Sequence, residues 1–340
     1  MSLREALEQL LRREDFTAEQ MQAVMQELMS GSATPAQIAA ILIALRAKGE
    51  TVTEVSAAAS VMRSLATPVH IEQKTHLVDT CGTGGDGANT FNISTASAFV
   101  SAAAGAKVAK HGNRSVSSQS GSADLLEQAG VNLNLTPDQV SQCVEQVGVG
   151  FMFAPAHHSA MKHVIGVRRE IGVRTIFNQL GPLTNPAQAP AQVLGVYDAA
   201  LLRPFAEVLS NLGSRHVMVV HAEDGLDEIS IASVTQVVEL KEGQITEWQI
   251  NPADFEIHHA DLTALQIQSS ADSLEIIQAV FDNQHPAAVD IVSLNAGASI
   301  YVAGLAPTYQ DGVAKARAVI ADGSAKQLFA DFINLTNQFK

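Results

Sequence analysis

Apolar residues recur at helical spacing through the first seventy residues, as in Leu3, Leu7 and Leu10. This spacing predicts an amphipathic helix at the start of the chain. Three more helices are predicted from N-capping signals, which lie at 17–20, 34–35 and 51–54. Because no strand pattern precedes Thr67-Pro68, the first seventy residues are expected to form a small helical domain.

The pattern changes near His76, where short apolar runs begin to alternate with helical segments. The predicted strands are the runs 77–78, 107–109, 150–153, 192–197 and 216–220. Such alternation predicts a largely parallel sheet covered by helices. Ligands of such sheets bind beyond the carboxyl ends of the strands, so the loops that follow the strands are the candidate binding elements.

A glycine-rich loop follows the first predicted strand. Gly82, Gly84, Gly85 and Gly87 fall within six residues, and small polar residues open the next predicted helix at Asn92. Glycine tolerates positive φ and lets backbone N–H groups approach a ligand closely. A strand, a glycine turn and a helix N-terminus together form an anion-binding site. The loop therefore predicts binding of phosphate.

Two familiar nucleotide-binding loops fit this stretch poorly. Gly82-x-Gly84-x-x-Gly87 matches the dinucleotide fingerprint, but residues 88–92 make a poor helix opening. The next predicted strand ends in Lys110-His111, where a ribose-binding site needs Asp or Glu. A Walker loop is disfavoured because no Gly-Lys-Ser/Thr closes the run.

A second polar loop follows the predicted strand at 107–109. It reads Lys110-His-Gly-Asn-Arg-Ser-Val-Ser-Ser118, and no acidic residue occurs between Lys107 and Ser122. Lysine supplies a point charge, arginine a planar fork and the serines neutral donors, a mixture suited to several phosphate oxygens. An exposed polar loop is the alternative interpretation. The concentration of cations and donors favours a binding function.

Adjacent carboxylates at Asp227-Glu228 are a candidate magnesium site, because Mg²⁺ binds one or two carboxylates together with substrate phosphates. An ordinary acidic turn explains the pair equally well. His157-His158 precede a cationic stretch that contains Arg168, Arg169 and Arg174. The histidine spacing disfavours zinc. A substrate-facing patch is favoured, in which the arginines hold a carboxylate bidentately.

Composition limits the partners and the compartment. The 340 residues are 46% hydrophobic and 16% charged, as expected for a globular protein, and the net charge of −14 argues against nucleic acid. Only two cysteines occur, Cys81 and Cys143, which fits a reducing cytoplasm. Early charges at Arg4 and Glu5 argue against a signal peptide, and charges interrupt the Ala-rich runs before membrane-spanning length.

Together these features resemble the anthranilate phosphoribosyltransferase family. The matching stretches span nearly the whole chain: 82–87, 92–95, 110–118, 120–124, 151–158, 167–170, 178–186, 227–230 and 294–298. The resemblance implies an α/β fold of the nucleoside phosphorylase/phosphoribosyltransferase type. It implies a helical domain at 1–72, joined in space by about 164–183, and an α/β domain with a largely parallel sheet at 73–340. It also implies homodimers that pair through the helical domains.

The resemblance further implies a reaction. Family members transfer the 5-phosphoribosyl group of PRPP to the amine of anthranilate, with Mg²⁺ as cofactor, in the second step of tryptophan biosynthesis from chorismate. That amine is neutral and needs no base, so no catalytic acid or base is assigned, and His111 is a candidate for a supporting role. The alternatives are a pyrimidine nucleoside phosphorylase, a relative that uses another aromatic amine, and a catalytically silent nucleic-acid-binding relative.

Positions that match the family's motifs give the candidate site residues. The implied PRPP-binding residues are Gly82, Gly85, Asp86, Thr90, Asn92, Ser94, Thr95, Lys110, His111, Gly112, Asn113, Arg114, Ser115, Val116, Ser117, Ser118 and Ser122. The implied anthranilate-binding residues are Gly82, Asn113 and Arg168. The implied magnesium ligands are Ser94, Asp227 and Glu228. Arg168 is expected at the cleft between the two domains.

Overall fold

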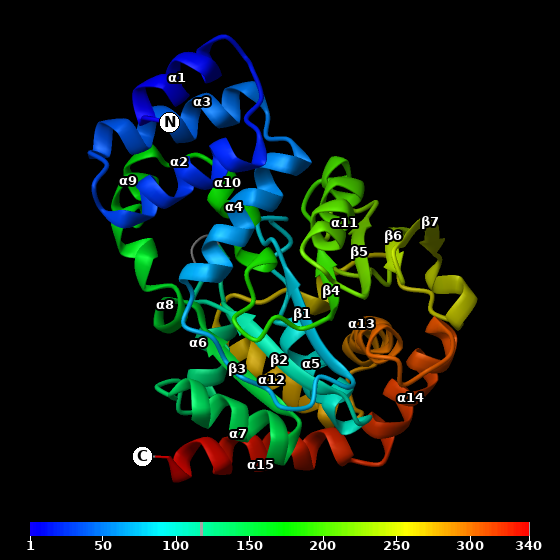
Figure 1. The fold of residues 1–340 in the computed structure, drawn as a ribbon. Helices are drawn as coiled ribbons and strands as arrows, with labels where there is room; N and C mark the ends of the chain where they lie inside the picture. Colours follow the sequence, from blue (N-terminus) through cyan, green and yellow to red (C-terminus); the bar gives the residue numbers. More distant parts are fainter. Residues whose placement is uncertain (116–117, 340) are drawn as a thin grey trace.

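The computed structural model describes residues 1–115 and 118–339, which form a helical bundle set against an α/β domain (Figure 1). The bundle contains α1 (Leu3–Leu11), α2 (Ala18–Ser30), α3 (Pro35–Lys48) and α4 (Val52–Leu65). Each of these helices begins at a capping box, and the four capping residues are Ser2, Thr17, Thr34 and Thr51. The predicted helix starts in this region are therefore confirmed.

Seven strands form one sheet in the order β3-β2-β1-β4-β5-β6-β7. Strands β3, β2, β1, β4 and β5 pair in parallel, and β6 and β7 are added antiparallel. The strands are β1 (Leu77–Gly82), β2 (Lys107–Gly112), β3 (Val149–Phe153), β4 (Ala191–Gly195), β5 (His216–Ala222), β6 (Thr235–Lys241) and β7 (Gln244–Ile250). The largely parallel sheet is confirmed, whereas the β6–β7 hairpin falls outside the predicted runs.

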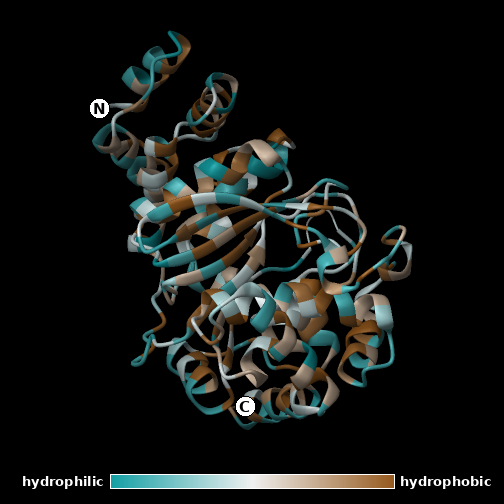
Figure 2. Ribbon diagram, turned by 90° about the vertical axis from the view of Figure 1, so that its right-hand side faces the viewer, coloured by the Kyte–Doolittle hydropathy of each residue, from teal (hydrophilic) through white to brown (hydrophobic). Residues whose placement is uncertain are grey.

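The five parallel strands are buried on both faces, and successive residues of one strand pack into different cores. Met218 and Val220 of β5 join the core of the α/β domain, whereas Val217 and Val219 join the core shared with the bundle. In Figure 2 the strands carry brown stretches between teal ones and lie among helices. These helices are α5 (Ile93–Ala103), α6 (Ser122–Gln128), α7 (Pro137–Val147), α11 (Leu202–Asn211), α12 (Ser270–Phe281), α13 (Pro286–Val302), α14 (Tyr309–Ala321) and α15 (Ser324–Gln338).

A later segment of the chain returns to the bundle, where α9 and α10 lie beside it in Figure 1. Val167, Ile176 and Phe177 share one hydrophobic core with Leu42 and Leu45 of α3. The domain boundary at 72 and the assignment of 164–183 to the helical domain stay predictions. This segment contains α9 (Ile165–Ile171), α10 (Ile176–Leu180) and a 3-10 turn at Gly181–Leu183, and it is preceded by α8 (Ala154–His157) and a 3-10 turn at Ser159–His163. Three other 3-10 turns lie at Ala199–Leu201, Pro252–Phe255 and Thr263–Leu265.

Both cysteines, Cys81 and Cys143, are free and buried. Burial raises the pKa of both thiols, so each stays protonated at neutral pH. Within the ranges that the structure describes, no helix combines the length and the apolar character needed to cross a bilayer.

A buried ion pair joins two helices of the bundle. Lys48 Nζ at the end of α3 lies 2.9 Å from Glu54 Oε2 in α4, and their side chains are only 3% and 0% exposed. Glu54 also accepts hydrogen bonds from the N–H groups of Phe16 at 2.9 Å and Thr51 at 2.8 Å. Asp15 gives Lys48 a second, exposed partner at 2.6 Å. Glu54 therefore connects α3, α4 and the turn before α2.

Replacing Glu54 with alanine is expected to lower the free energy of unfolding by about 1–3 kcal/mol, because the buried Phe16 N–H loses its acceptor and Lys48 keeps only Asp15 as a carboxylate partner. Urea denaturation measures this change. The control is Glu8→Ala, which removes one partner of the exposed Arg4–Glu8 pair and should cost less than about 1 kcal/mol. Equal costs for the two variants would show that burial does not govern the Lys48–Glu54 interaction.

Candidate active site

The predicted binding elements meet at the carboxyl edge of the sheet. Strands β1 and β2 are parallel neighbours, with Leu77 opposite Lys107, so the loops that follow them leave the same edge. Asp227-Glu228 follow β5 and reach this edge as well, because the Gly84 N–H donates a hydrogen bond to Asp227 Oδ2 at 2.7 Å. The structure therefore brings together the glycine loop, the Lys110 loop and the acidic pair.

Glycines leave the space that Asp227 occupies. A Cβ on Gly82 would lie 2.5 Å from Asp227 Oδ2, and a Cβ on Gly195 would lie 1.5 Å from the Asp227 carbonyl oxygen. Gly84 and Gly85 also have φ values of +67° and +82°, which side chains rarely adopt. The glycine pattern therefore serves two purposes, the turn itself and the close approach of a carboxylate.

Three carboxyl groups influence one another at this edge. Burial, followed by the charge of Asp86, raises the pKa of Asp227 to about 7. Burial and the charge of Asp227 raise the pKa of Glu228 to about 8, although nearby Lys110 opposes the shift. No three acidic, histidine or cysteine side chains within 1–115 and 118–339 are placed to hold a metal ion by themselves. Two neighbouring carboxylates are a usual protein contribution to a Mg²⁺ site, where other ligands complete the coordination.

Lys110 is a buried cation held at a fixed position. Its Nζ donates hydrogen bonds to the Thr80 carbonyl at 2.5 Å and to Ser94 Oγ at 3.1 Å, and the residue is 3% exposed. Burial lowers its pKa, while the charges of Asp79 and Glu228 oppose that shift. Lys110 thus joins β1, β2 and the first turn of α5, where an anion would meet the positive end of the helix dipole.

His111 is a neutral group in a histidine cluster. Its ring lies 5.0 Å from that of His158, and neither Nε2 atom has a hydrogen-bond partner in the part of the chain that the structure describes. Burial and the neighbouring His158 lower the pKa of His111 to about 3, and burial together with His157 lowers that of His158 to about 4. Both rings are therefore neutral at physiological pH and contribute no positive charge.

The side chain of Asn92 is fully engaged by its surroundings. Its Oδ1 accepts hydrogen bonds from Ser120 Oγ and Ser273 Oγ, both at 2.8 Å, and its Nδ2 donates to the Ser120 carbonyl at 3.1 Å. Its backbone N–H also donates to Ser273 Oγ at 3.0 Å. Asn92 therefore connects the start of α5, the end of the Lys110 loop and α12.

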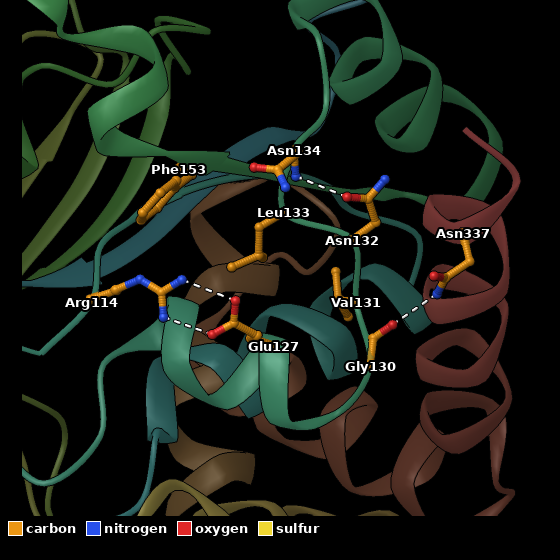
Figure 3. A pocket seen from close by; sticks show the side chains of 9 residues that line it. All are labelled: Arg114, Glu127, Gly130, Val131, Asn132, Leu133, Asn134, Phe153 and Asn337. Atoms are coloured by element: carbon orange, nitrogen blue, oxygen red, sulfur yellow. Dashed lines mark hydrogen bonds and ion pairs between the residues drawn. The ribbon is translucent and has the colours of Figure 1, made fainter. Parts of the chain in front are cut away.

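The Arg114 side chain contacts carboxylates of α6 and, within the described residues, does not contact the glycine loop. Its Nη1 lies 2.7 Å from Glu127 Oε2, and its Nη2 lies 3.0 Å from Glu127 Oε1 (Figure 3). Its Nη1 also lies 3.3 Å from Asp124 Oδ1. Asp124 also accepts a hydrogen bond from the Ser115 N–H at 2.8 Å, and Ser115 Oγ lies 3.0 Å from Ser118 Oγ. Two further predicted positions lie outside the described residues, Val116 and Ser117.

A cavity of about 360 Å³ lies beyond the Arg114 ion pair (Figure 3). Its lining includes Leu133, Phe153 and Asn337 of α15, and Arg114 is its one contribution from the described predicted site residues. Because the acidic pair and Lys110 are absent from its lining, this cavity is separate from the candidate active site.

The remaining predicted residues support the two loops. A Cβ on Gly112 would lie 2.2 Å from Ser122 Oγ, which donates a hydrogen bond to the Asn113 carbonyl at 3.3 Å. Thr95 is buried in α5, and its Oγ1 has no hydrogen-bond partner within the described ranges. Thr90 forms an isolated β-bridge with the segment before α12.

Arg168 lies on α9, on the bundle side of the molecule, with its guanidinium 5.4 Å from the ring centre of Phe177. Burial lowers its pKa. Sequence reasoning assigned no role to Ser120, Ser273 or Asp79, although Asp79 Oδ1 accepts the His111 N–H at 3.3 Å. A lone serine 181 residues from its partner carries no signal in one sequence, whereas Asp79 directly precedes the glycine loop and was within reach of motif reasoning.

Comparisons with known proteins agree with this arrangement. The chain matches the glycosyl transferase family twice, over residues 4–66 for the helical bundle domain and over residues 74–326 for the a/b domain. The fold and the site therefore define a two-domain glycosyl transferase.

Close relatives narrow this class. The anthranilate phosphoribosyltransferase of Hydrogenovibrio crunogenus is 74% identical over 339 residues, which cover 100% of both chains. The anthranilate phosphoribosyltransferase structure from Thermus thermophilus has a TM-score of 0.92 at 41% identity, over 98% of this chain and 99% of that one. The Saccharomyces cerevisiae enzyme in complex with PRPP and Mg has a TM-score of 0.88 at 25% identity, over 99% and 98%. The chain belongs to the anthranilate phosphoribosyltransferase family.

The raised pKa of Asp227 predicts a pH-dependent cost to the metal-free fold. An unfolded Asp ionises near pH 4 and the folded one near pH 7, so the folded chain binds more protons between these values and loses stability as the pH rises through them. Asp227→Asn keeps an acceptor for the Gly84 N–H without the charge. The melting temperature of Asp227→Asn minus that of the wild type should therefore increase by on the order of 5 °C from pH 5 to pH 8.

Thermal melts without metal measure this gain. The charge-matched control is Asp254→Asn, because Asp254 is an exposed residue in a 3-10 turn far from the acidic pair in the sequence. Its melting temperature should differ from that of the wild type by the same amount at each pH. A constant difference for Asp227→Asn as well would mean that Asp227 is ionised in the folded chain throughout this range.

Proposed function

We propose that this chain transfers the 5-phosphoribosyl group from PRPP to the amine of anthranilate, giving N-(5-phosphoribosyl)anthranilate and pyrophosphate. The observation that carries the proposal is the meeting of the glycine loop, Lys110 and Asp227-Glu228 at one edge of the sheet. Backbone donors and a fixed cation beside paired acids suit a diphosphate that binds together with a magnesium ion. The 74% identity to the Hydrogenovibrio crunogenus enzyme supports the same reaction.

The donor would bind across the two loops. Lys110 Nζ and the first N–H groups of α5 would contact phosphate oxygens, with Ser94 and Thr95 as hydroxyl donors. Because Lys110 is already held by Thr80 and Ser94, it needs little rearrangement when an anion arrives. Arg114 would exchange its carboxylate partners for phosphate oxygens or stay as a support of the loop.

Magnesium would be held by Asp227 and Glu228, with Ser94 as a neutral ligand. Bound there, the ion supplies charge stabilisation for the pyrophosphate that leaves. The raised pKa values of the two acids support this assignment, because crowded and buried carboxylates lack a compensating positive charge.

Anthranilate would lie between Arg168, which would bind its carboxylate, and Asn113, which would align the ring or amine. The amine nitrogen forms a bond to C1′ of the ribose while the C1′–O bond to pyrophosphate breaks and its electron pair leaves with the pyrophosphate. The amine then releases a proton to solvent. His111 stays neutral and is a weak base, so orientation of the substrates, worth about 7–11 kcal/mol in intramolecular reactions, carries the catalysis.

A homodimer through the bundle is part of this proposal. Such an interface would cover exposed apolar residues of the bundle, among them Leu11 of α1 at 72% and Ile43 of α3 at 41% exposure. The proposed compartment is the cytoplasm, which the two free thiols support.

The direct test of the function follows the loss of anthranilate fluorescence in the presence of PRPP and Mg²⁺. The wild-type chain should consume anthranilate only when both are present. Glu228→Gln should lower kcat by roughly 100-fold or more, since even outer-shell changes at metal sites cost 10–100-fold, and extra Mg²⁺ should restore part of the rate.

Glu223→Gln serves as the control, because Glu223 is an exposed acid on the same segment that pairs with Gln236. Its kinetics should match the wild type. Unchanged turnover in a chelator would reject the metal role, and no anthranilate consumption by the wild type would reject the proposed reaction.

Ser273→Ala should raise KM for PRPP by roughly 10-fold, because Asn92 and its N–H lose two hydrogen bonds that fix the start of α5. KM for anthranilate should stay within about twofold. The matched control is Ser293→Ala. Ser293 is also fully buried but, unlike Ser273, its Oγ has no hydrogen-bond partner within the described residues. Steady-state kinetics would count against this role if both Michaelis constants rose together or if the two variants behaved alike.

A further inference from the structure

Arg174 reaches from the segment that packs on the bundle to the glycine loop. It lies between α9 and α10, whose residues Val167 and Ile176 belong to the core shared with the bundle. Its Nη2 nevertheless donates a hydrogen bond to the Gly84 carbonyl at 2.8 Å. One side chain therefore joins two parts of the molecule that the proposed function assigns to different substrates.

The glycine loop is shaped to receive this guanidinium. A Cβ on Gly85 would lie 2.0 Å from Arg174 Nη2, so a side chain at this position would displace it. The guanidinium carbon also lies 3.7 Å from the ring centre of Tyr197. The Tyr197 N–H donates to Thr83 Oγ1 at 3.1 Å, so the aromatic platform and the loop are fixed to each other.

The other end of the arginine is incompletely bonded. Nη1 is buried and has no hydrogen-bond partner among the described residues. A side chain that served only to brace the fold would be expected to satisfy its buried donors, because an unpaired one costs about 1–3 kcal/mol. An unpaired N–H donor beside the glycine loop indicates that the Arg174–Gly84 contact is suited to a second arrangement, in which a ligand is bound.

The same segment carries the candidate acceptor residue. Arg168 of α9 lies over the ring of Phe177 of α10, and Arg174 stands in the short connection between these helices. Arg174 precedes Phe177 by three residues, so the chain itself links the Gly84 contact to the ring beside Arg168.

We propose that Arg174 is a positioning residue that couples the binding of the two substrates. This inference rests on the proposed function. Donor binding would fix the glycine loop, the loop would fix Arg174 through Gly84, and Arg174 would fix the α9–α10 connection in the form that binds the aromatic carboxylate. Because coupling free energies are reciprocal, the acceptor should tighten donor binding by the same factor.

Calorimetry can measure this coupling without turnover. The acceptor probe is 2-methylbenzoate, which keeps the ring and the carboxylate but lacks the attacking amine, and the donor is PRPP with Mg²⁺. In the wild type, saturating donor should tighten 2-methylbenzoate binding by roughly 5-fold or more, the lower end of usual coupling strengths. In Arg174→Met the factor should fall to about 1, while the Kd of 2-methylbenzoate alone stays within about twofold.

Two further variants make the test specific. Arg174→Lys keeps a charged donor for the Gly84 carbonyl and should retain part of the coupling, which also covers the case that Arg174→Met folds poorly. Lys162→Met removes one positive charge from an exposed position in the 3-10 turn before α9 and should keep the wild-type factor.

The inference is wrong if Arg174→Met retains the wild-type coupling factor, or if the wild type shows no coupling. It is also wrong if Arg174→Met weakens the binding of 2-methylbenzoate equally with and without the donor. Each of these results would leave wild-type consumption of anthranilate intact. Failure of the proposed function would instead appear as absence of that consumption.

Discussion

The placement of Asp227 is the constraint on which the site depends. Its carboxylate and backbone enter the carboxyl edge of the sheet where glycines end β1 and β4, and its Oδ2 accepts the Gly84 N–H at 2.7 Å. That bond fixes the glycine loop in the positive-φ form that exposes its N–H groups. A side chain at position 82 or 195 would collide with Asp227 and exclude it from this edge. Without Asp227, the Gly84 N–H of the glycine loop would lose its acceptor.

The fold was largely predictable because its signals are local. Capping residues such as Thr17 and Thr51 act within one helical turn, and the apolar runs of the five parallel strands are buried on both faces. The β6–β7 hairpin was missed because polar residues interrupt the apolar pattern of both strands, in β6 although it is largely buried and in β7 because it is an exposed edge strand. Local periodicity therefore identified the five parallel strands and missed the antiparallel pair.

The site was predictable in its chemistry and less so in its contacts. Glycine spacing and the Lys110 loop correctly placed the binding elements at one edge, since parallel strands bring their carboxyl ends together. The partners of individual groups depend on tertiary distance. Arg114 has the right chemistry for phosphate, yet it pairs here with Glu127, and Asn92 is held by a serine from α12. The roles of the individual residues stay predictions.

Under the proposed function, the electrostatics of the edge would suit a loose, cation-like transition state. Asp86, Asp227 and Glu228 repel one another, and burial raises the pKa of the latter two, so the edge favours positive charge. Lys110 is held in place by its hydrogen bond to the Thr80 carbonyl, and His111 is neutral. The protein itself therefore adds little further positive charge beside the acids. Under the proposed function, a metal-bound diphosphate would bring the missing cation and the leaving group together. The acids would thus tie catalysis to arrival of the donor.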